Sequence, residues 1–492
     1  MELKVKTSDW SAGLPVAMIN KKMAEGLGVH AGDRITIKTY SKSPKEMITI
    51  LDTSETFVKK GFIAISTEIK KRLDLREGQR INVAYSDAPE SVLFIKEKIN
   101  GAELSDEKIK AIIRDVVNNS LTEPEVAVFV SAMYRNGMTF NETISLINSI
   151  LASGKTLKFR NKYVVDKHCI GGVAGNRTTP LVVSICAAAG LTMPKTSSRA
   201  ITSAAGTADC IETIAKVEFP MDKVKKIVQK TGGCMTWGGS LGMVPADSKI
   251  IKVEKMLKLD PVAQLLASIM SKKLAVGSKY ILIDIPYGKN AKVSKSKGLF
   301  LKKKFEQLAK HFKVKMKVVL TKANEPIGDG VGPALEMIDV IKILDPEKKG
   351  PEDLEKKSLF LSGKILEMTG TAKKGKGTHL AKEILNSGKA WKKFNEIIKE
   401  QEGKLDGLEM GKYKKDIHSN KSGKIKLINN KLINALARSS GCPIDKFSGV
   451  FLHCHVGDKI KKGDKLLTIY AESKPRLGEA VNFYNRTNPF KI

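Results

Sequence analysis

Hydrophobic positions follow different periods along the chain, and each change of period predicts a change of structure. In the first 86 residues, segments 27–37 and 73–83 match, and each follows a short helical stretch and turns at a glycine into an alternating strand. The two glycines, Gly32 and Gly78, are 78 − 32 = 46 residues apart. Residues 1–86 are therefore predicted to form a β-rich repeat barrel, whose expected use is assembly and not catalysis.

From about residue 95 the apolar spacing becomes helical. The apolar residues of 109–117 fall on one helix face. Two capping boxes, Thr122-x-x-Glu125 and Thr139-x-x-Glu142, open further apolar-periodic runs. We expect a small all-α domain made of residues 95–155 and, later in the chain, of about 246–277.

Strand-like and helix-like segments alternate in 160–245 and 280–345, as in a central α/β domain that binds phosphate. Residues 350–425 are predicted as a Lys-rich helical connection. Residues 426–492 are predicted as a C-terminal α+β domain, and the turn pattern at 456–466 resembles lipoyl-type hammerhead folds. The predicted fold class is therefore multidomain α/β, with an N-terminal β-rich repeat barrel and an all-α domain added to the α/β body.

The net charge of the chain suggests an anionic partner but does not identify its chemical class. Lys and Arg number 85 against 52 Asp and Glu, a net charge of +33. Residues 351–430 hold 18 Lys against 11 acidic residues, without the interleaved aromatics of a single-strand-binding surface, so a solvated helical face is favoured over nucleic-acid binding. No signal-peptide core or membrane span is seen, and the six cysteines form no C-x-x-C pair. We expect a cytoplasmic protein without metal, membrane or nucleic-acid partner.

Two loops carry the candidate chemistry. The first follows the strand predicted at 163–166 and reads Lys167-His168-Cys169-Ile170-Gly171-Gly172-Val173-Ala174-Gly175-Asn176-Arg177-Thr178-Thr179. Its glycines allow close backbone approach, and the amides of the following helix favour an anion. The second loop, 197–207, places five hydroxyls and an arginine between a strand and a helix start. Either loop alone could be a turn or a helix cap, but together they predict a phosphate or sugar-phosphate site.

The two loops also carry a family resemblance. The motif Asp166-Lys167-His168-x-x-Gly171-Gly172 and the segment 198–209 are similar to the thymidine/pyrimidine-nucleoside phosphorylase family. Further matches are Leu259-Asp260-Pro261, segment 267–275 and Gly332-Pro333-Ala334-Leu335-Glu336, so the likeness runs from about residue 90 to the C-terminus. The added repeat and the Ser-Arg-Ala-Ile-Thr-Ser sequence resemble the archaeal-type AMP phosphorylase branch of the family.

This resemblance implies phosphorolysis of AMP, with CMP and UMP as further candidates, to the free base and ribose 1,5-bisphosphate. The implied partners are AMP and inorganic phosphate, with no cofactor, in a homodimer or a larger homo-oligomer. The alternative is a pyrimidine nucleoside phosphorylase acting on thymidine or uridine. A third hypothesis, a non-catalytic nucleic-acid-binding protein, would explain only the charge.

The resemblance also assigns roles to residues. Asp260 is the implied proton donor to the leaving base, which requires a protonated and hence partly desolvated carboxyl group; without the family likeness it would be an ordinary Asp opening a helix. Lys167 is the implied phosphate ligand, and Lys272 is expected near the base or sugar. The implied AMP contacts are Gly172, Ser198, Arg199, Ala200, Ile201, Thr202, Ser203, Thr207, Ser268 and Lys292, with Lys289 as a competitor for the role of Lys292.

Three positions depart from the family pattern. Cys169 stands where pyrimidine-nucleoside members have Ser, and we expect a contact through the backbone there. The stretch Lys252-Val253-Glu254 lacks the arginine that grips a pyrimidine base, which favours a nucleotide substrate. Asp329-Gly330 replaces the more usual Arg-Ala, so the sequence leaves the role of that loop open.

Overall fold

The computed structural model describes residues 1–7, 10–11, 13, 15–200 and 203–492, and the chain forms two compact units. One unit comprises Met1–Ser153 and Val244–Ser268, and the other comprises Gly154–Met243 and Ile269–Ile492. The chain is thus a multidomain α/β protein. No helix in the described residues is long and apolar enough to cross a membrane.

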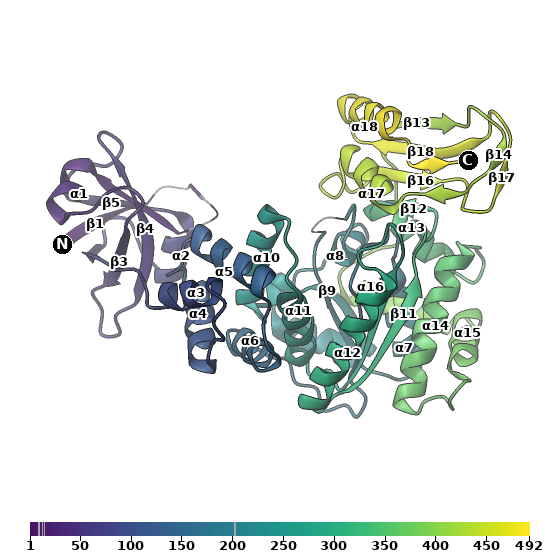
Figure 1. Ribbon diagram of the computed structural model, residues 1–492, viewed down its shortest axis with the longest axis horizontal. Helices are drawn as coiled ribbons and strands as arrows, with labels where there is room; N and C mark the ends of the chain where they lie inside the picture. Colours follow the sequence, from purple (N-terminus) through teal and green to yellow (C-terminus); the bar gives the residue numbers. More distant parts are fainter. Residues whose placement is uncertain (8–9, 12, 14, 201–202) are drawn as a thin grey trace. The chain divides into compact units, whose positions relative to one another are not determined.

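The first unit begins with a closed six-stranded barrel in the order β1-β5-β2-β4-β3-β6 (Figure 1). Its strands are β1 (Glu2–Thr7), β2 (Val16–Asn20), β3 (Arg34–Thr39), β4 (Glu46–Ser54), β5 (Phe62–Ile65) and β6 (Arg80–Tyr85). Helices α1 (Lys21–Leu27) and α2 (Thr67–Leu73) end at Gly28 and Asp74, both with positive φ (68° and 57°). Gly32 and Gly78 also have positive φ (95° and 71°). Both copies of the repeat therefore use the same left-handed turns between helix and strand.

The rest of the first unit is helical. It contains α3 (Ser91–Ile99), α4 (Asp106–Asn118), α5 (Glu123–Asn136), α6 (Phe140–Ala152) and α10 (Pro245–Leu257). Both capping boxes form: the side chains of Thr122 and Thr139 accept from the backbone N–H groups of Glu125 and Glu142, whose carboxylates accept in return. The two helix starts predicted from these motifs are confirmed.

The second unit contains a parallel sheet in the order β11-β10-β7 and a parallel pair β8-β9, joined by a bridge between Val164 and Thr192 (Figure 1). Its strands are β7 (Val165–Cys169), β8 (Met193–Ser197), β9 (Gly233–Trp237), β10 (Tyr280–Tyr287) and β11 (Lys315–Lys322). Around them lie α7 (Thr178–Ala188), α8 (Thr207–Ile211), α9 (Met221–Thr231), the 3-10 helix η1 (Gly238–Leu241), α12 (Lys295–His311) and α13 (Pro333–Leu344). Helix α11 (Val262–Ala275) begins in the first unit and ends in the second.

One strand differs from the expectation. The strand predicted at 163–166 lies at Val165–Cys169, because β10 pairs with it residue by residue from Val165 to Cys169. Lys167 is consequently a buried strand residue and not the first residue of an open loop.

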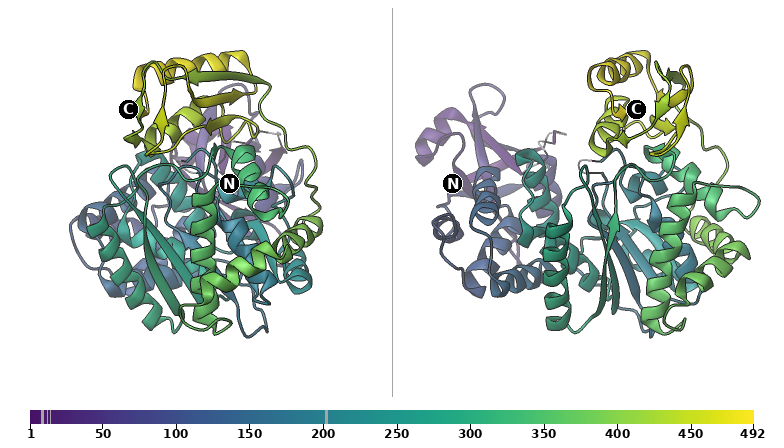
Figure 2. Two further views of the ribbon diagram at one scale, coloured as in Figure 1. Left: turned by 90° about the vertical axis from the view of Figure 1, so that its right-hand side faces the viewer. Right: turned by 45° about the vertical axis from the view of Figure 1, so that its right-hand side comes forward.

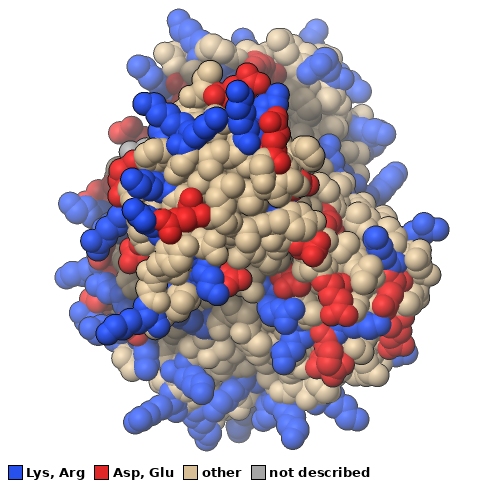
Figure 3. Space-filling model, turned by 90° about the vertical axis from the view of Figure 1, so that its left-hand side faces the viewer, with Lys and Arg blue, Asp and Glu red and all other residues tan. Residues whose placement is uncertain are grey.

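The Lys-rich stretch predicted as helical over 350–425 forms three helices, α14 (Glu352–Thr369), α15 (Gly377–Asn386) and α16 (Lys389–Glu400), but its last part, from residue 413, contains strands β13 (Tyr413–His418) and β14 (Gly423–Lys424). Their apolar residues, including Leu366, Ile384 and Ile397, are buried in one core with residues of α7. Figure 3 shows a different face of the molecule, on which Lys and Arg side chains are likewise spread over the surface with Asp and Glu among them. The lysines of this stretch thus accompany helices that have ordinary apolar faces.

The C-terminal segment forms a sheet in the order β12-β16-β18-β13, with α17 (Asn430–Ser439) and α18 (Lys474–Thr487) packed against it (Figures 1 and 2). The strands are β12 (Gly330–Val331), β13 (Tyr413–His418), β16 (Gly449–Leu452) and β18 (Lys465–Ala471). The short strands β14 (Gly423–Lys424), β15 (Leu427–Ile428), β17 (Lys459–Ile460) and β19 (Phe490–Lys491) form two further pairs, β14-β17 and β15-β19. Because β12 comes from residues before α13, this sheet includes part of the central chain.

Candidate active site

Strand β7 carries a buried cluster of charged side chains. The carboxylate of Asp166 binds Lys195 at 3.1 Å and Lys273 at 2.6 Å, and all three side chains are buried. Lys195 Nζ also donates to the backbone oxygen of Lys167 at 2.7 Å. Burial alone would raise the pKa of Asp166, but the two lysines outweigh it and the pKa is lowered. Burial lowers the pKa of Lys273 to about 7.

Lys167, the expected phosphate ligand, is buried on the same strand. Its Nζ donates to Thr178 Oγ1 at 2.5 Å, which ties the strand to the first turn of α7. Burial lowers the pKa of Lys167 to about 8. Lys167 is thus a buried lysine that can lose its proton near neutral pH.

A second buried carboxylate lies on β10. Asp284 binds Lys357 of α14 at 3.1 Å and accepts from Thr321 Oγ1 at 2.7 Å. Its strand position pairs with Cys169, and burial followed by the charge of Asp284 raises the pKa of that thiol. Four lysines thus accompany two carboxylates: Lys195, Lys273 and Lys357 bind Asp166 or Asp284, and Lys167 bonds to Thr178. This excess of positive charge in a buried region suits a bound anion.

His168 follows Lys167 on β7. Burial, and then the charges of Lys273 and Lys195, lower the pKa of its imidazole well below the usual value. The ring is therefore neutral near physiological pH and can act as a donor or an acceptor, but not as a cation.

The glycine-rich loop is closely packed on both sides. Gly171 and Gly172 have φ of +87° and +88°. A Cβ atom on Gly172 would lie 2.5 Å from the Cβ of Lys292, and one on Gly175 would lie 2.3 Å from the backbone oxygen of Ile327. Two of the expected AMP contacts, Gly172 and Lys292, are therefore adjacent, and glycine is required for that approach.

Arg177 joins the first loop to the second. Its Nε donates to Glu336 of α13 at 2.8 Å, and its other nitrogens donate to Thr207 Oγ1 at 2.9 Å and to the backbone oxygen of Ala205 at 3.0 Å. Arg177 and Glu336 are buried. The structure thus brings the two sequence motifs and the Gly332-Pro333-Ala334-Leu335-Glu336 motif into one arrangement.

Asp209 shapes the second loop. Its Oδ2 accepts from the backbone N–H groups of Ala200 at 2.6 Å and Gly206 at 2.7 Å. Ser203 Oγ donates to the oxygen of Ala205 at 2.9 Å, and Ser198 is exposed. The expected contacts Ile201 and Thr202 lie outside the described residues.

Arg199, another expected AMP contact, already has carboxylate partners. Its guanidinium donates to Glu212 and Glu218, each at 2.8 Å, and stacks 5.0 Å from the ring centre of Trp237. The hydrogen bond to Glu212 is the leading cause of a raised pKa for Arg199.

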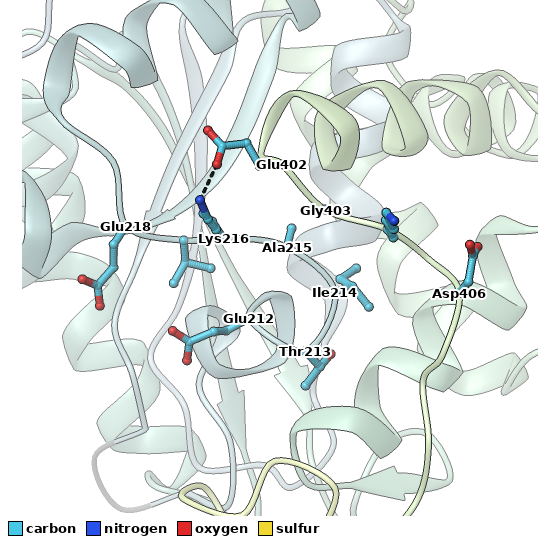
Figure 4. A pocket seen from close by; sticks show the side chains of 11 residues that line it. Glu212, Thr213, Ile214, Ala215, Lys216, Glu218, Glu402, Gly403 and Asp406 are labelled. Atoms are coloured by element: carbon cyan, nitrogen blue, oxygen red, sulfur yellow. Dashed lines mark hydrogen bonds and ion pairs between the residues drawn. The ribbon is translucent and has the colours of Figure 1, made fainter.

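A surface pocket adjoins this arrangement, and none of the expected site residues that the structure describes lines it. It is lined by residues 212–218 and by Glu402, Gly403, Lys404 and Asp406 (Figure 4). Glu212, the partner of Arg199, is one lining residue, and Lys216 binds Glu402 at 2.5 Å. The pocket lies beside the second loop and is not the expected substrate site.

The expected proton donor belongs to the first unit. Asp260 is exposed between α10 and α11, and Ser268, half-buried on α11, is the last residue of that unit. Lys272 is half-buried one helical turn later, in the second unit.

Sequence reasoning did not single out Arg177, Lys195, Lys273, Asp284 or Lys357. A signal was available for some of them: Asp284 lies inside the apolar strand 281–285, and Lys195 lies inside β8. A charge within a buried strand requires a partner, but the partner cannot be read from local sequence.

Comparisons with known proteins agree with this architecture. The description "Glycosyl transferase family, helical bundle domain" matches residues 92–154, and "Glycosyl transferase family, a/b domain" matches 161–391. "Pyrimidine nucleoside phosphorylase C-terminal domain" matches 424–491. An anthranilate phosphoribosyltransferase from Thermus thermophilus has a TM-score of 0.53 at 18% identity, covering 63% of this chain and 99% of that one, which concerns the fold alone.

Curated relatives extend the similarity over the whole chain. AMP phosphorylase from Methanococcus aeolicus is 42% identical, with 100% of this chain and 97% of that protein covered. AMP phosphorylase from Pyrococcus furiosus is also 42% identical, with 100% and 98% covered. The fold and the matched domains define an enzyme of the pentosyltransferase class. Within this class, the chain belongs to the AMP phosphorylase family.

Proposed function

We propose that the protein catalyses the reaction of AMP with inorganic phosphate to give adenine and ribose 1,5-bisphosphate. The observation that carries the proposal is the full-length identity of about 42% to proteins named AMP phosphorylase. The four lysines near Asp166 and Asp284, of which Lys167, Lys195 and Lys273 are buried, support it, because a site for two anionic substrates must offset their repulsion. CMP and UMP are further candidate substrates.

The chemistry needs no protein nucleophile. A phosphate oxygen forms the new bond to C1′ while the bond from C1′ to the base breaks, through an oxocarbenium-like state related to that of glycoside hydrolysis. The electron pair of the broken bond leaves with the base. The protein must therefore hold phosphate close to C1′ and stabilise the negative charge that develops on the base.

We assign phosphate binding to Lys167 and the amides of the glycine-rich loop, and base protonation to Asp260. Since Asp260 is exposed, its desolvation would come from substrate binding. The proposed AMP contacts are Gly172, Ser198, Arg199, Ala200, Ile201, Thr202, Ser203, Thr207, Ser268 and Lys292. Arg199 would contribute through its backbone, because its guanidinium is bound by Glu212 and Glu218.

A substrate panel tests the function. AMP, CMP, UMP, adenosine, uridine and thymidine are each incubated with and without phosphate, and base release is followed by chromatography. We expect release of adenine from AMP only when phosphate is present, and little release from nucleosides. Cleavage of thymidine with AMP inert would instead establish the pyrimidine nucleoside phosphorylase alternative, and no phosphate-dependent cleavage would leave the nucleic-acid-binding hypothesis.

We further propose that the chain acts in the cytoplasm as a homodimer or larger homo-oligomer, with the N-terminal barrel as an assembly module. All six cysteines are free thiols, which suits a reducing compartment.

A further inference from the structure

Helix α17 of the C-terminal segment contacts both candidate substrate loops with side chains one helical turn apart. Asn430 Oδ1 accepts from the backbone N–H of Ala174 at 3.2 Å, 256 residues away in sequence. Asn434 Oδ1 accepts from the backbone N–H of Ala204 at 3.1 Å, 230 residues away. Residues at i and i+4 share a helix face, so one face of α17 binds the glycine-rich loop and the 198–207 loop together.

Packing places the two loops in the same core. Ala174 and Ala204 are 2% and 0% exposed, and both belong to the apolar core of the C-terminal segment with Ile433, Leu436 and Ala437 of α17. Each loop therefore inserts one small side chain and offers one amide to this helix. The glycine-rich loop is also held from the other side, because Ile327 N donates to the oxygen of Ala174 at 3.0 Å.

The identity of the two side chains matters for these contacts. A backbone N–H can only donate, so the amide oxygen of each asparagine must face its loop. Asn430 is fully buried, and among the described residues its Nδ2 has no hydrogen-bond acceptor. A buried amide with an unsatisfied donor is destabilising, so packing alone would favour an apolar residue at this position. The hydrogen bond to Ala174 is the interaction in the structure that offsets this cost.

We propose that Asn430 and Asn434 are positioning residues through which α17 sets the shape of the two substrate loops, one asparagine for each loop. The roles of the loops rest on the proposed function. Asn430 contacts the glycine-rich loop at Ala174; since the amides of this loop are assigned to phosphate and only its Gly172 to AMP, Asn430 governs mainly phosphate binding. Asn434 positions the segment expected to contact AMP and therefore governs AMP binding.

The experiment compares Asn430→Ala and Asn434→Ala with Asn429→Ala in the full-length protein. Asn429 caps the same helix, its Oδ1 accepting from Lys431 N at 3.0 Å and Leu432 N at 3.3 Å, and it makes no hydrogen bond to either loop among the described residues. The control therefore destabilises α17 without removing a loop contact. Tm, KM for each substrate, kcat and the amide hydrogen exchange of Ala174 and Ala204 are measured for all three variants.

We expect Asn430→Ala to raise the KM for phosphate about five- to tenfold, the effect of one lost hydrogen bond, with a smaller change for AMP and faster exchange at Ala174. Asn434→Ala should reverse this selectivity, raising the KM for AMP and speeding exchange at Ala204. Asn429→Ala should lower the Tm without selectivity for either substrate.

The proposal is overturned if both loop variants match Asn429→Ala, with a lower Tm but no substrate selectivity and no local change in exchange. Failure of the proposed function is separate: the wild type would then not cleave AMP. In that case the exchange rates at Ala174 and Ala204 still decide whether the two asparagines hold the loops.

Discussion

At the scale of single residues, the candidate site depends on lysines whose charge is not guaranteed near neutral pH. Burial lowers the pKa of Lys167 to about 8 and of Lys273 to about 7, whereas a lysine in water titrates near ~10.4. The same burial that strengthens attraction to an anion therefore favours loss of the proton. Lys167 is charged below pH 8 and becomes neutral as the pH rises through this value.

The first prediction follows from this titration. We expect kcat/KM for phosphate to fall above about pH 8, approaching a tenfold decrease per pH unit, because this parameter reports the pKa of a group in the free enzyme. Lys167→Arg serves as the control, since arginine does not titrate in this range. The variant should have weaker phosphate binding but no fall near pH 8; an unchanged fall would assign the titration to another group, such as Lys273.

The second prediction concerns Asp260. Asp260→Asn removes the proton donor without changing side-chain size, so we expect kcat to fall about 10²- to 10⁴-fold, the usual contribution of general acid catalysis. The dissociation constant of AMP, measured by calorimetry, should change little. Asp106→Asn is the control, because Asp106 is an exposed carboxylate at a helix start of the same unit. Unchanged kcat in Asp260→Asn would remove the assignment.

Single positions also show what sequence can and cannot predict. Lys167 was singled out as a phosphate ligand by the family resemblance. Arg177 was not, although it touches both loops, because its carboxylate partner Glu336 is 159 residues away. Lys273 and Asp166 are likewise 107 residues apart. Local pattern identifies a loop that can bind an anion, but the partners that orient it come from distant segments and depend on the packed fold.

At the scale of elements, helix starts were predictable where the interactions that set them lie within a few consecutive residues. The capping boxes at Thr122 and Thr139 form as predicted because each involves a four-residue segment. The strand around Lys167 was displaced by about two residues, since pairing with β10 and not local propensity sets its limits. That shift decides whether Lys167 is exposed or buried.

The glycine-rich loop allows a matched test at this scale. Gly171 and Gly172 have nearly equal positive φ, so alanine at either costs about 1–2 kcal/mol of backbone strain. At Gly172 the new Cβ would collide, at 2.5 Å from the Cβ of Lys292; at Gly171 no atom of the described residues, chain neighbours aside, lies within 4 Å. We expect Gly172→Ala to lose at least about tenfold more kcat/KM for AMP than Gly171→Ala, equivalent to ~1.4 kcal/mol. Equal losses would show that strain alone matters.

At the scale of the whole molecule, the net charge of +33 divides into two parts with different consequences. Lys167, Lys195 and Lys273 are buried, and the half-buried Lys357, which binds Asp284, comes from the Lys-rich stretch that the sequence left without a role. Many others lie on solvated faces such as that of Figure 3. Composition therefore predicted an anionic ligand, but only the fold separates lysines that face carboxylates in the core from those that face water.

The barrel provides the last prediction, which concerns assembly. Deleting residues 1–86 should reduce the mass of the assembly, measured by light scattering after gel filtration, while phosphate-dependent cleavage of AMP is retained, because the barrel contains no expected site residue. The deletion also removes the ion pair between Arg34 and Glu125 and the bond from Arg72 to Asn118. Arg34→Ala in the full chain is therefore the control: it breaks the ion pair but keeps the barrel, and should keep the mass. An unchanged mass after the deletion would show that the barrel does not mediate assembly.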